Sequence, residues 1–108
     1  MASQALCNIQ QDGYIYIVQE REFVNLNQPI FRVGNTQTGM ARIRKYPNDS
    51  KVFFMCNVEN AYNLALIVIQ SFKKQFTQQN NIGYRYFEGD INEMMLLICN
   101  LIQTKGQM

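Results

Sequence analysis

The stretch Gly13-Tyr-Ile-Tyr-Ile-Val18 decides the fold, because a run of β-branched and aromatic residues that follows a glycine is typical of a strand. Side chains alternate between the two faces of a strand. Tyr14 and Tyr16 therefore share one face, and Ile15 and Ile17 share the other. The strand offers two tyrosine hydroxyls on a single face.

The flanking sequence predicts further strands and helices. Charged residues, asparagines and a final proline indicate a connecting loop over 19–29. Apolar residues at helical spacing, Ala65 among them, would pack the helix over 58–76 against the sheet. The expected elements are strands over 30–33 and 51–56, a short helix within 36–46, and helices over 58–76 and from 91 onward. This pattern predicts an α+β fold, a three-stranded, mostly antiparallel sheet flanked by helices. We expect a polar leader over 1–12, a single domain over 13–104 and a tail over 105–108.

Composition limits the function. The chain has 108 residues, of which 47% are hydrophobic, and this suffices for one core. It contains no histidine, so histidine-based triads, proton shuttles and metal sites are excluded. The net charge of +2 is too small for a bulk polycation, so any affinity for nucleic acid must come from a local patch.

No targeting or membrane segment is expected. Residues 1–11 lack the basic start and apolar stretch of a signal peptide, and the apolar run Leu64–Ile69 is too short to span a bilayer. We therefore expect a soluble, intracellular and cytoplasmic protein without membrane contact. The same run leaves the helix over 58–76 without a polar side. This predicts either a homodimer through that helix or its burial by the C-terminal helix.

Basic residues gather in the middle of the chain. Five of the ten lie between positions 32 and 51, where Asp49 is the only acidic residue. Such a cluster is typical of a solvated face or of a phosphate-binding surface, and both interpretations stay open. The five are Arg32, Arg42, Arg44, Lys45 and Lys51.

Short motifs in a fixed order resemble a known family. They are Gly13-Tyr-Ile-Tyr16, Phe31-Arg-Val-Gly-Asn-Thr36, Arg42 to Ser50 with its Tyr-Pro pair, the long helix, and Tyr86-Phe-Glu-Gly-Asp90. This order resembles the GIY-YIG nuclease superfamily, in particular the branch of phages and large DNA viruses. The resemblance covers essentially the whole domain. It implies an α+β fold with a central three-stranded antiparallel sheet and a viral or phage protein that acts on DNA.

The resemblance also implies roles for particular residues. Tyr16 would act on the attacking water beside Tyr14, Arg32 replaces a second-strand tyrosine, and Arg42 would stabilise the phosphate charge in the transition state. These four form the candidate catalytic set. The candidate nucleic-acid-binding set is Arg32, Asn35, Thr36, Arg42, Arg44, Lys45 and Lys51.

Two departures from the family pattern concern catalysis. Where the family's second motif has a lysine, this chain has Asn35. The helix glutamate that would hold Mg²⁺ or Mn²⁺ falls near Ala65, where there is no carboxylate. Glu88 is then the candidate metal ligand, with Asp90 beside it. The functional hypotheses are a degenerate nuclease domain that still binds nucleic acid, an active nuclease with a relocated carboxylate, and a protein-interaction module.

Overall fold

A five-stranded antiparallel sheet forms the centre of the computed structural model, which describes residues 13–106. The strand order is β3-β1-β2-β5-β4, and every neighbouring pair is antiparallel. The strands are β1 (Gly13–Gln19), β2 (Ile30–Thr36), β3 (Lys51–Val58), β4 (Thr77–Gln78) and β5 (Tyr86–Glu88). The predicted α+β class is confirmed.

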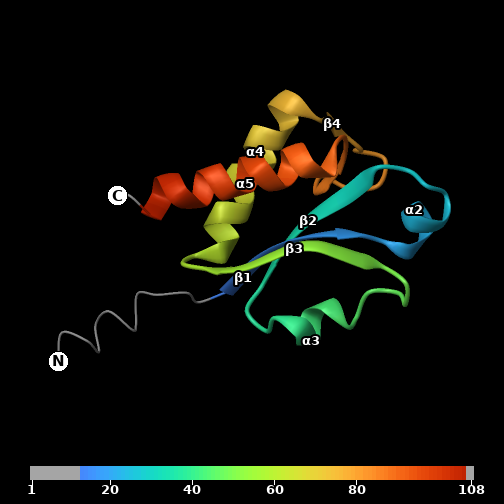
Figure 1. Cartoon of the computed structure of the whole chain (residues 1–108), viewed down its shortest axis with the longest axis horizontal. Coiled ribbons are helices and arrows are strands. Elements are labelled where there is room, and N and C mark those ends of the chain that lie inside the picture. Colours follow the sequence, from blue (N-terminus) through green and yellow to red (C-terminus); the bar gives the residue numbers. More distant parts are fainter. Residues whose placement is uncertain (1–12, 107–108) are drawn as a thin grey trace.

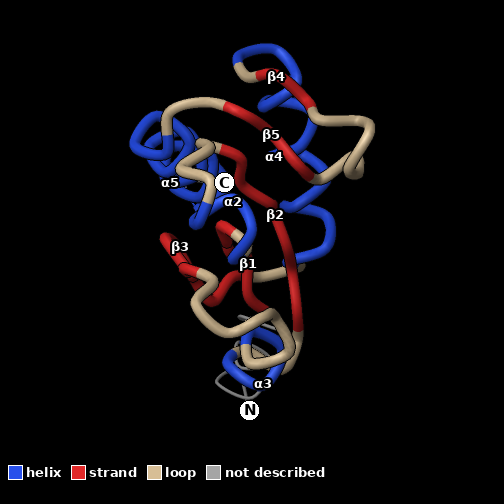
Figure 2. Tube along the Cα trace, turned by 90° about the vertical axis from the view of Figure 1, so that its right-hand side faces the viewer, coloured by secondary structure: helices blue, strands red, loops and turns tan. Residues whose placement is uncertain are grey.

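Helices lie on both sides of this sheet. They are α2 (Arg21–Asn25), α3 (Met40–Ile43), α4 (Ala61–Gln75) and α5 (Ile91–Gly106). The two long helices, α4 and α5, lie together on one side, and the short helix α3 lies on the opposite side (Figures 1 and 2). We call the two sides of the sheet the helix face, under α4 and α5, and the α3 face.

The helix face carries the hydrophobic core. Ile15 and Ile17 of β1 and Val33 of β2 are fully buried there against α4 and α5. From the helices, Ala65 of α4 and Met94 of α5 are also fully buried. Burial of apolar side chains on this face supplies most of the stabilising free energy of the fold.

Strand register defines the α3 face. Tyr16 of β1 lies opposite Gly34 of β2, and Val18 lies opposite Arg32. Arg32 in turn lies opposite Tyr86 of β5. Because directly paired residues of antiparallel strands point to the same side, these five positions share one face.

The number of strands differs from the prediction of three. The extra strands, β4 and β5, are two and three residues long, and such short strands carry no alternation pattern that a sequence can reveal. The second strand also continues through Gly34 to Thr36. It was expected to end before the glycine.

The predicted helices and loops also need correction. The short helix expected within 36–46 is confirmed as α3, and it begins only at Met40, because β2 includes Thr36 and Gly39 has a φ of 63° just before the helix. The loop expected over 19–29 contains α2.

The long helix expected from position 58 starts later, at Ala61. The strand β3 continues to Val58, and Asn60, with a φ of 52°, is the N-cap whose side chain accepts a hydrogen bond from Asn63 N. The expected cap of the last helix is confirmed, since Asp90 Oδ1 accepts a hydrogen bond from Glu93 N at 3.0 Å.

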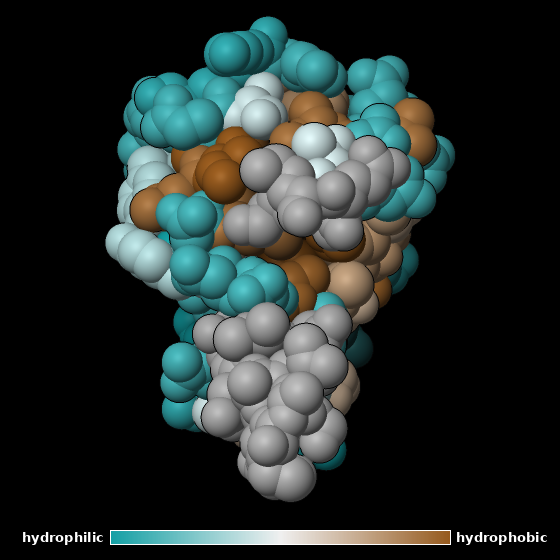
Figure 3. Space-filling view, turned by 90° about the vertical axis from the view of Figure 1, so that its left-hand side faces the viewer, coloured by the Kyte–Doolittle hydropathy of each residue, from teal (hydrophilic) through white to brown (hydrophobic). Residues whose placement is uncertain are grey.

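The apolar run of α4 is covered mainly within the chain. Leu64, Ala65, Val68 and Ile69 are buried in the core that α5 also joins, while Ile67 remains 37% exposed. Figure 3 shows apolar surface on one end of the molecule, at the level of α4 and α5, with hydrophilic residues around it. This helix therefore packs mainly on β1 and β2 and only to a smaller extent on α5, and a homodimer stays a prediction. Between residues 13 and 106, no helix is long and apolar enough to cross a membrane.

Candidate functional site

The site begins at the contact between Tyr16 and Gly34. A Cβ atom placed on Gly34 would lie only 2.2 Å from Tyr16 Cζ, so the tyrosine ring lies directly across the glycine backbone. No larger residue fits at this position unless the ring moves. The side chain of Tyr16 is fully buried as a result of this packing and of the segment that follows α3.

Tyr46 brings a second hydroxyl to the first. The Tyr16 and Tyr46 hydroxyls form a hydrogen bond of 2.9 Å. Arg32 Nη1 donates to the Tyr46 hydroxyl at 2.7 Å and to the Tyr16 hydroxyl at 3.4 Å. Two phenol groups and one guanidinium group thus meet on the α3 face, at the point where β1 and β2 pair.

Arg42 approaches the same tyrosine from α3. Its guanidinium carbon lies 5.1 Å from the centre of the Tyr46 ring, within the range of a cation–π interaction. Arg32 lies 5.9 Å from the same ring centre. Arg42 from α3 and Arg32 from β2 therefore place two guanidinium groups around one aromatic ring.

Tyr86 and Glu20 extend the cluster along β2. The guanidinium carbon of Arg32 lies 5.9 Å from the centre of the Tyr86 ring. The Tyr86 hydroxyl donates a hydrogen bond of 2.6 Å to Glu20 Oε2, at the start of α2. We refer to Tyr16, Arg32, Arg42, Tyr46 and Tyr86 as the tyrosine–arginine cluster.

The cluster shifts the pKa values of its members. Burial lowers the pKa of Arg32, but the proximity of three tyrosines outweighs this effect and the net pKa is raised. Burial, followed by the hydrogen bond with Tyr16, raises the pKa of Tyr46 well above its usual range. Burial and the neighbouring Glu20 carboxylate raise the pKa of Tyr86 to about 12. At neutral pH the guanidinium is charged and both of these phenols are protonated.

The other residues of the candidate DNA-binding set are divided between the two faces. Thr36 lies on the α3 face, where its hydroxyl bonds Thr38 in the turn toward α3. Arg44 and Lys45 are exposed in the turn that follows α3. Asn35 pairs with Ile15 and Lys51 pairs with Gln19, so the register assigns these two positions to the helix face.

Tyr14, the remaining candidate catalytic residue, lies on the α3 face beside the start of α3. A Cβ atom on Gly39 would lie 3.3 Å from Tyr14 Cε1, so the turn before α3 passes close to its ring. Tyr14 therefore supports the turn and lies outside the tyrosine–arginine cluster.

The residues present do not fit the metal site that the family resemblance implies. Ala65 is a fully buried residue of the core beneath the helix face, on the opposite side of the sheet from Tyr16. Glu88 lies opposite Ile30, and strand spacings place its backbone roughly 15 Å from that of Tyr16. In the described part of the chain, no three potential metal ligands from His, Cys, Asp and Glu form a group.

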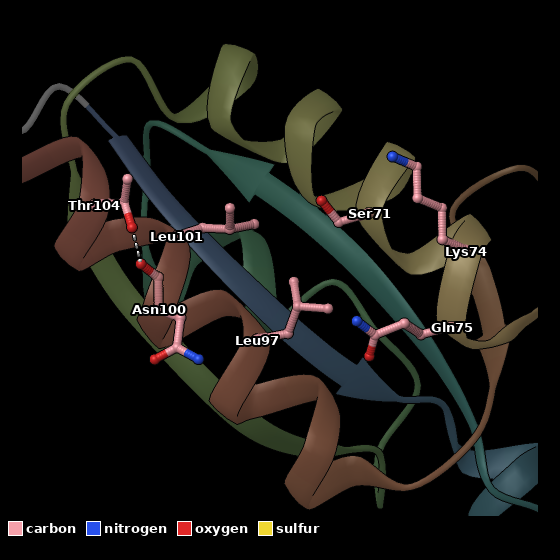
Figure 4. A pocket seen from close by; sticks show the side chains of 7 residues that line it. All are labelled: Ser71, Lys74, Gln75, Leu97, Asn100, Leu101 and Thr104. Carbon is pink, nitrogen blue, oxygen red and sulfur yellow. Dashed lines mark hydrogen bonds between the residues drawn. The ribbon is translucent and has the colours of Figure 1, made fainter.

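Two cavities accompany these elements. One, of about 350 Å³, lies between the strands β1 and β3 and the turn after α3, and Tyr46 forms part of its wall. The other, of about 240 Å³, lies between α4 and α5, with Lys74, Gln75 and Leu97 among its lining residues (Figure 4). Only the first borders the tyrosine–arginine cluster.

Sequence reasoning assigned no role to three residues of the site. Tyr46 lies in the motif from Arg42 to Ser50, and Tyr86 begins the motif that ends at Asp90. Their presence in these motifs could have marked both tyrosines as candidate site residues. Glu20 had no such signal, because its contact depends on β5 pairing with β2.

Comparisons with family models, with curated proteins and with solved structures find no match for this chain. The GIY-YIG resemblance therefore stays a prediction.

Proposed function

We propose that the α3 face binds the phosphate backbone of nucleic acid, and that the domain is a GIY-YIG-like nuclease fold without metal-assisted cleavage. The observation that carries this proposal is the convergence of Arg32 and Arg42 on Tyr46. In the part of the chain that the structure describes, tyrosine rings and hydroxyls contact these guanidinium groups, and no carboxylate pairs with them. Their charge is available to an anion.

The chemistry of the cluster suits a phosphodiester. A guanidinium group has five N–H donors in a planar fork that matches phosphate oxygens. Arg32 is half-buried and keeps its charge, while Arg42, Arg44 and Lys45 extend the positive charge along the turn after α3. Backbone contacts of this kind position a protein on nucleic acid without reading its sequence.

The same residues argue against cleavage. A general base needs a pKa near the working pH, and the raised pKa values of Tyr46 and Tyr86 remove both from this role. The Tyr16 hydroxyl is buried and bonded to Tyr46. Position 65, the family's metal-ligand position, carries a methyl group in the core.

Fluorescence anisotropy with a labelled DNA duplex tests the proposal. The double variant Arg42→Ala/Arg44→Ala should weaken binding at least tenfold and make the salt slope about two units less steep. The matched control is Lys73→Ala/Lys74→Ala, which removes the same charge from the last turn of α4 on the other side of the sheet. Equal effects of both variants, or an affinity that does not change with salt, would overturn the proposal and favour a protein-interaction module.

One observation favours an active nuclease as the second candidate function. Glu20 brings a carboxylate to the Tyr86 end of the cluster through its hydrogen bond with the Tyr86 hydroxyl, so it is a better relocated ligand than Glu88. We nevertheless expect the unmodified protein to leave plasmid DNA intact with Mg²⁺ or Mn²⁺, because one carboxylate is a weak anchor for a hard cation. Nicking that Glu20→Gln abolishes would replace the first proposal with this one.

A further inference from the structure

A cavity lies beside Tyr46, and the phosphate-binding proposal assigns it no ligand. Its volume of about 350 Å³ falls within the range of small-ligand sites. Val18 of β1 and Val52 of β3 provide apolar lining, together with Ile43 at the end of α3. The side chain of Tyr46 is shared between this cavity and the tyrosine–arginine cluster.

Polar groups surround this apolar lining. Arg44 contributes hydrogen-bond donors and Asp49 contributes acceptors. The Ser50 hydroxyl oxygen accepts a hydrogen bond from Arg21 N at 3.0 Å, so its own proton remains available for donation. A flat ring with hydrogen-bond donors and acceptors on its edge could pack its faces against the apolar lining of this cavity. Its edge could bond the polar groups around that lining.

The turn that carries these polar groups is fixed by the backbone. Ser50 N donates to Pro47 O at 3.2 Å, and Asp49 has a φ of 74°, in the left-handed region. Few non-glycine residues adopt that region, and Asp tolerates it better than most. The polar edge of the cavity is therefore held in place before any ligand arrives, and this reduces the entropy lost on binding.

We propose that this cavity accepts one unstacked nucleobase while Arg42 and Arg44 hold the phosphate attached to it. The inference rests on the proposed function and specifies its substrate class: single-stranded or locally unpaired nucleic acid is preferred over an intact duplex. A base can reach such a cavity only when it has left the stack. The cavity between α4 and α5 offers no equivalent, because no aromatic ring lines it (Figure 4). It also lies on the opposite side of the sheet from α3, the helix that holds Arg42.

Three oligonucleotides of equal length and label test this inference on the unmodified protein: a single strand, the same strand made entirely of abasic sites, and the corresponding duplex. All three present phosphates, but only the first presents free bases. The single strand should bind about tenfold more tightly than the other two, as expected when one base stacks in a protein site. Because the abasic strand needs no change to the protein, this comparison does not depend on a variant that folds.

A protein variant locates the effect. Val52 is 40% exposed, and Val52→Phe should fill part of the cavity and remove the preference for the single strand. The matched control, Ile67→Phe, adds a similar ring to a partly exposed position on α4 and should leave the preference unchanged.

The outcomes separate the two proposals. Equal, salt-dependent binding of all three oligonucleotides would overturn the nucleobase site and leave phosphate binding intact. A preference for the single strand that Val52→Phe does not reduce would also overturn the assignment of this cavity. If none of the three binds, the proposed function fails and the nucleobase site fails with it.

Discussion

The two faces of the sheet share the same strands and are filled in opposite ways. On the helix face, Ile15, Ile17 and Val33 pack against α4 and α5 without a polar group among the core residues described. On the α3 face, the neighbouring positions along the same strands bring together Tyr16 and Arg32 with Tyr46. A single step along a strand therefore separates core from candidate site. The comparison shows that closeness in the sequence does not make a strand residue part of this site. The residue must also occupy a register position whose side chain points to the α3 face.

The largest expected effect tests the separation of the faces directly. Ala65→Glu introduces a carboxylate at the family's ligand position, but this position is in the core. An unpaired buried charge should lower the free energy of unfolding by about 4 kcal/mol, without producing Mn²⁺-dependent nicking. Urea unfolding and a plasmid assay measure the two effects.

The control for this variant is Gln70→Glu, at an exposed position of the same helix, which should change stability by about 0.5 kcal/mol or less. If Ala65→Glu is as stable as the control and nicks DNA, position 65 faces the tyrosines and the comparison of the two faces is wrong.

The second prediction concerns packing on the α3 face. Gly34→Ala places a methyl group against the buried Tyr16 ring and should cost about 3 kcal/mol of unfolding free energy, the upper part of the range for overpacking. Gly83→Ala is the control, because its Cβ would approach only the partly exposed Tyr86 ring, at 3.1 Å. Thermal and urea unfolding compare the two. Equal losses of unfolding free energy in the two variants would show that the Tyr16 ring moves aside at little cost, and would contradict this prediction.

The third prediction addresses the hydrogen bonds of the cluster. Tyr46→Phe removes the acceptor of the 2.7 Å bond from Arg32 and the partner of the Tyr16 hydroxyl. We expect a loss of about 1 to 2 kcal/mol of unfolding free energy, since the fully buried Tyr16 and the half-buried Arg32 each lose a hydrogen-bond partner. Tyr84→Phe serves as the control, because Tyr84 is 54% exposed and its side-chain hydroxyl bonds only its neighbour Arg85 among the described residues. A larger loss in the control than in Tyr46→Phe would contradict the assignment.

The smallest effect is a dependence on pH. The pKa of Tyr86 is raised to about 12, so the folded protein holds this proton more tightly than the unfolded chain does. Its contribution to stability is complete below about pH 10 and decreases as the pH rises toward 12. Ultraviolet titration should show late ionisation of two phenols, Tyr46 and Tyr86, and Tyr86→Phe should remove the earlier of the two. If every tyrosine ionised near the usual pKa of a free phenol, the cluster would not raise the pKa values of Tyr46 and Tyr86, and the prediction would be wrong.

Much of this architecture was predictable from local sequence. The alternation in Gly13–Val18 assigns the tyrosines and isoleucines to opposite faces, and the Asp90 cap marks the last helix. Helical spacing also indicates that Ala65 faces the sheet, which the structure bears out. That spacing already conflicts with the metal-ligand role that the family pattern gives this position.

The rest depends on contacts between distant segments. The hydrogen bond between Tyr86 and Glu20 joins positions far apart in sequence and exists only because β5 pairs with β2. Likewise, the length of α3 depends on where β2 ends and on the left-handed backbone at Gly39. Propensity and periodicity describe neighbours along the chain, so they carry no information on either feature.

The strand order has a consequence for how the protein folds. The strands β1, β2 and β3 are consecutive in the chain and adjacent in the sheet, whereas β5 joins β2 only after β3 and α4 have intervened. Closing a longer loop costs more chain entropy, so the three local strands are expected to pair first and β5 last. Tyr16, Arg32 and Tyr46 would then meet early, and Tyr86 would arrive at an arginine already in place. In the native state the same order predicts that β5 and its edge partner β4 open first, with the earliest amide exchange of the sheet in these two strands.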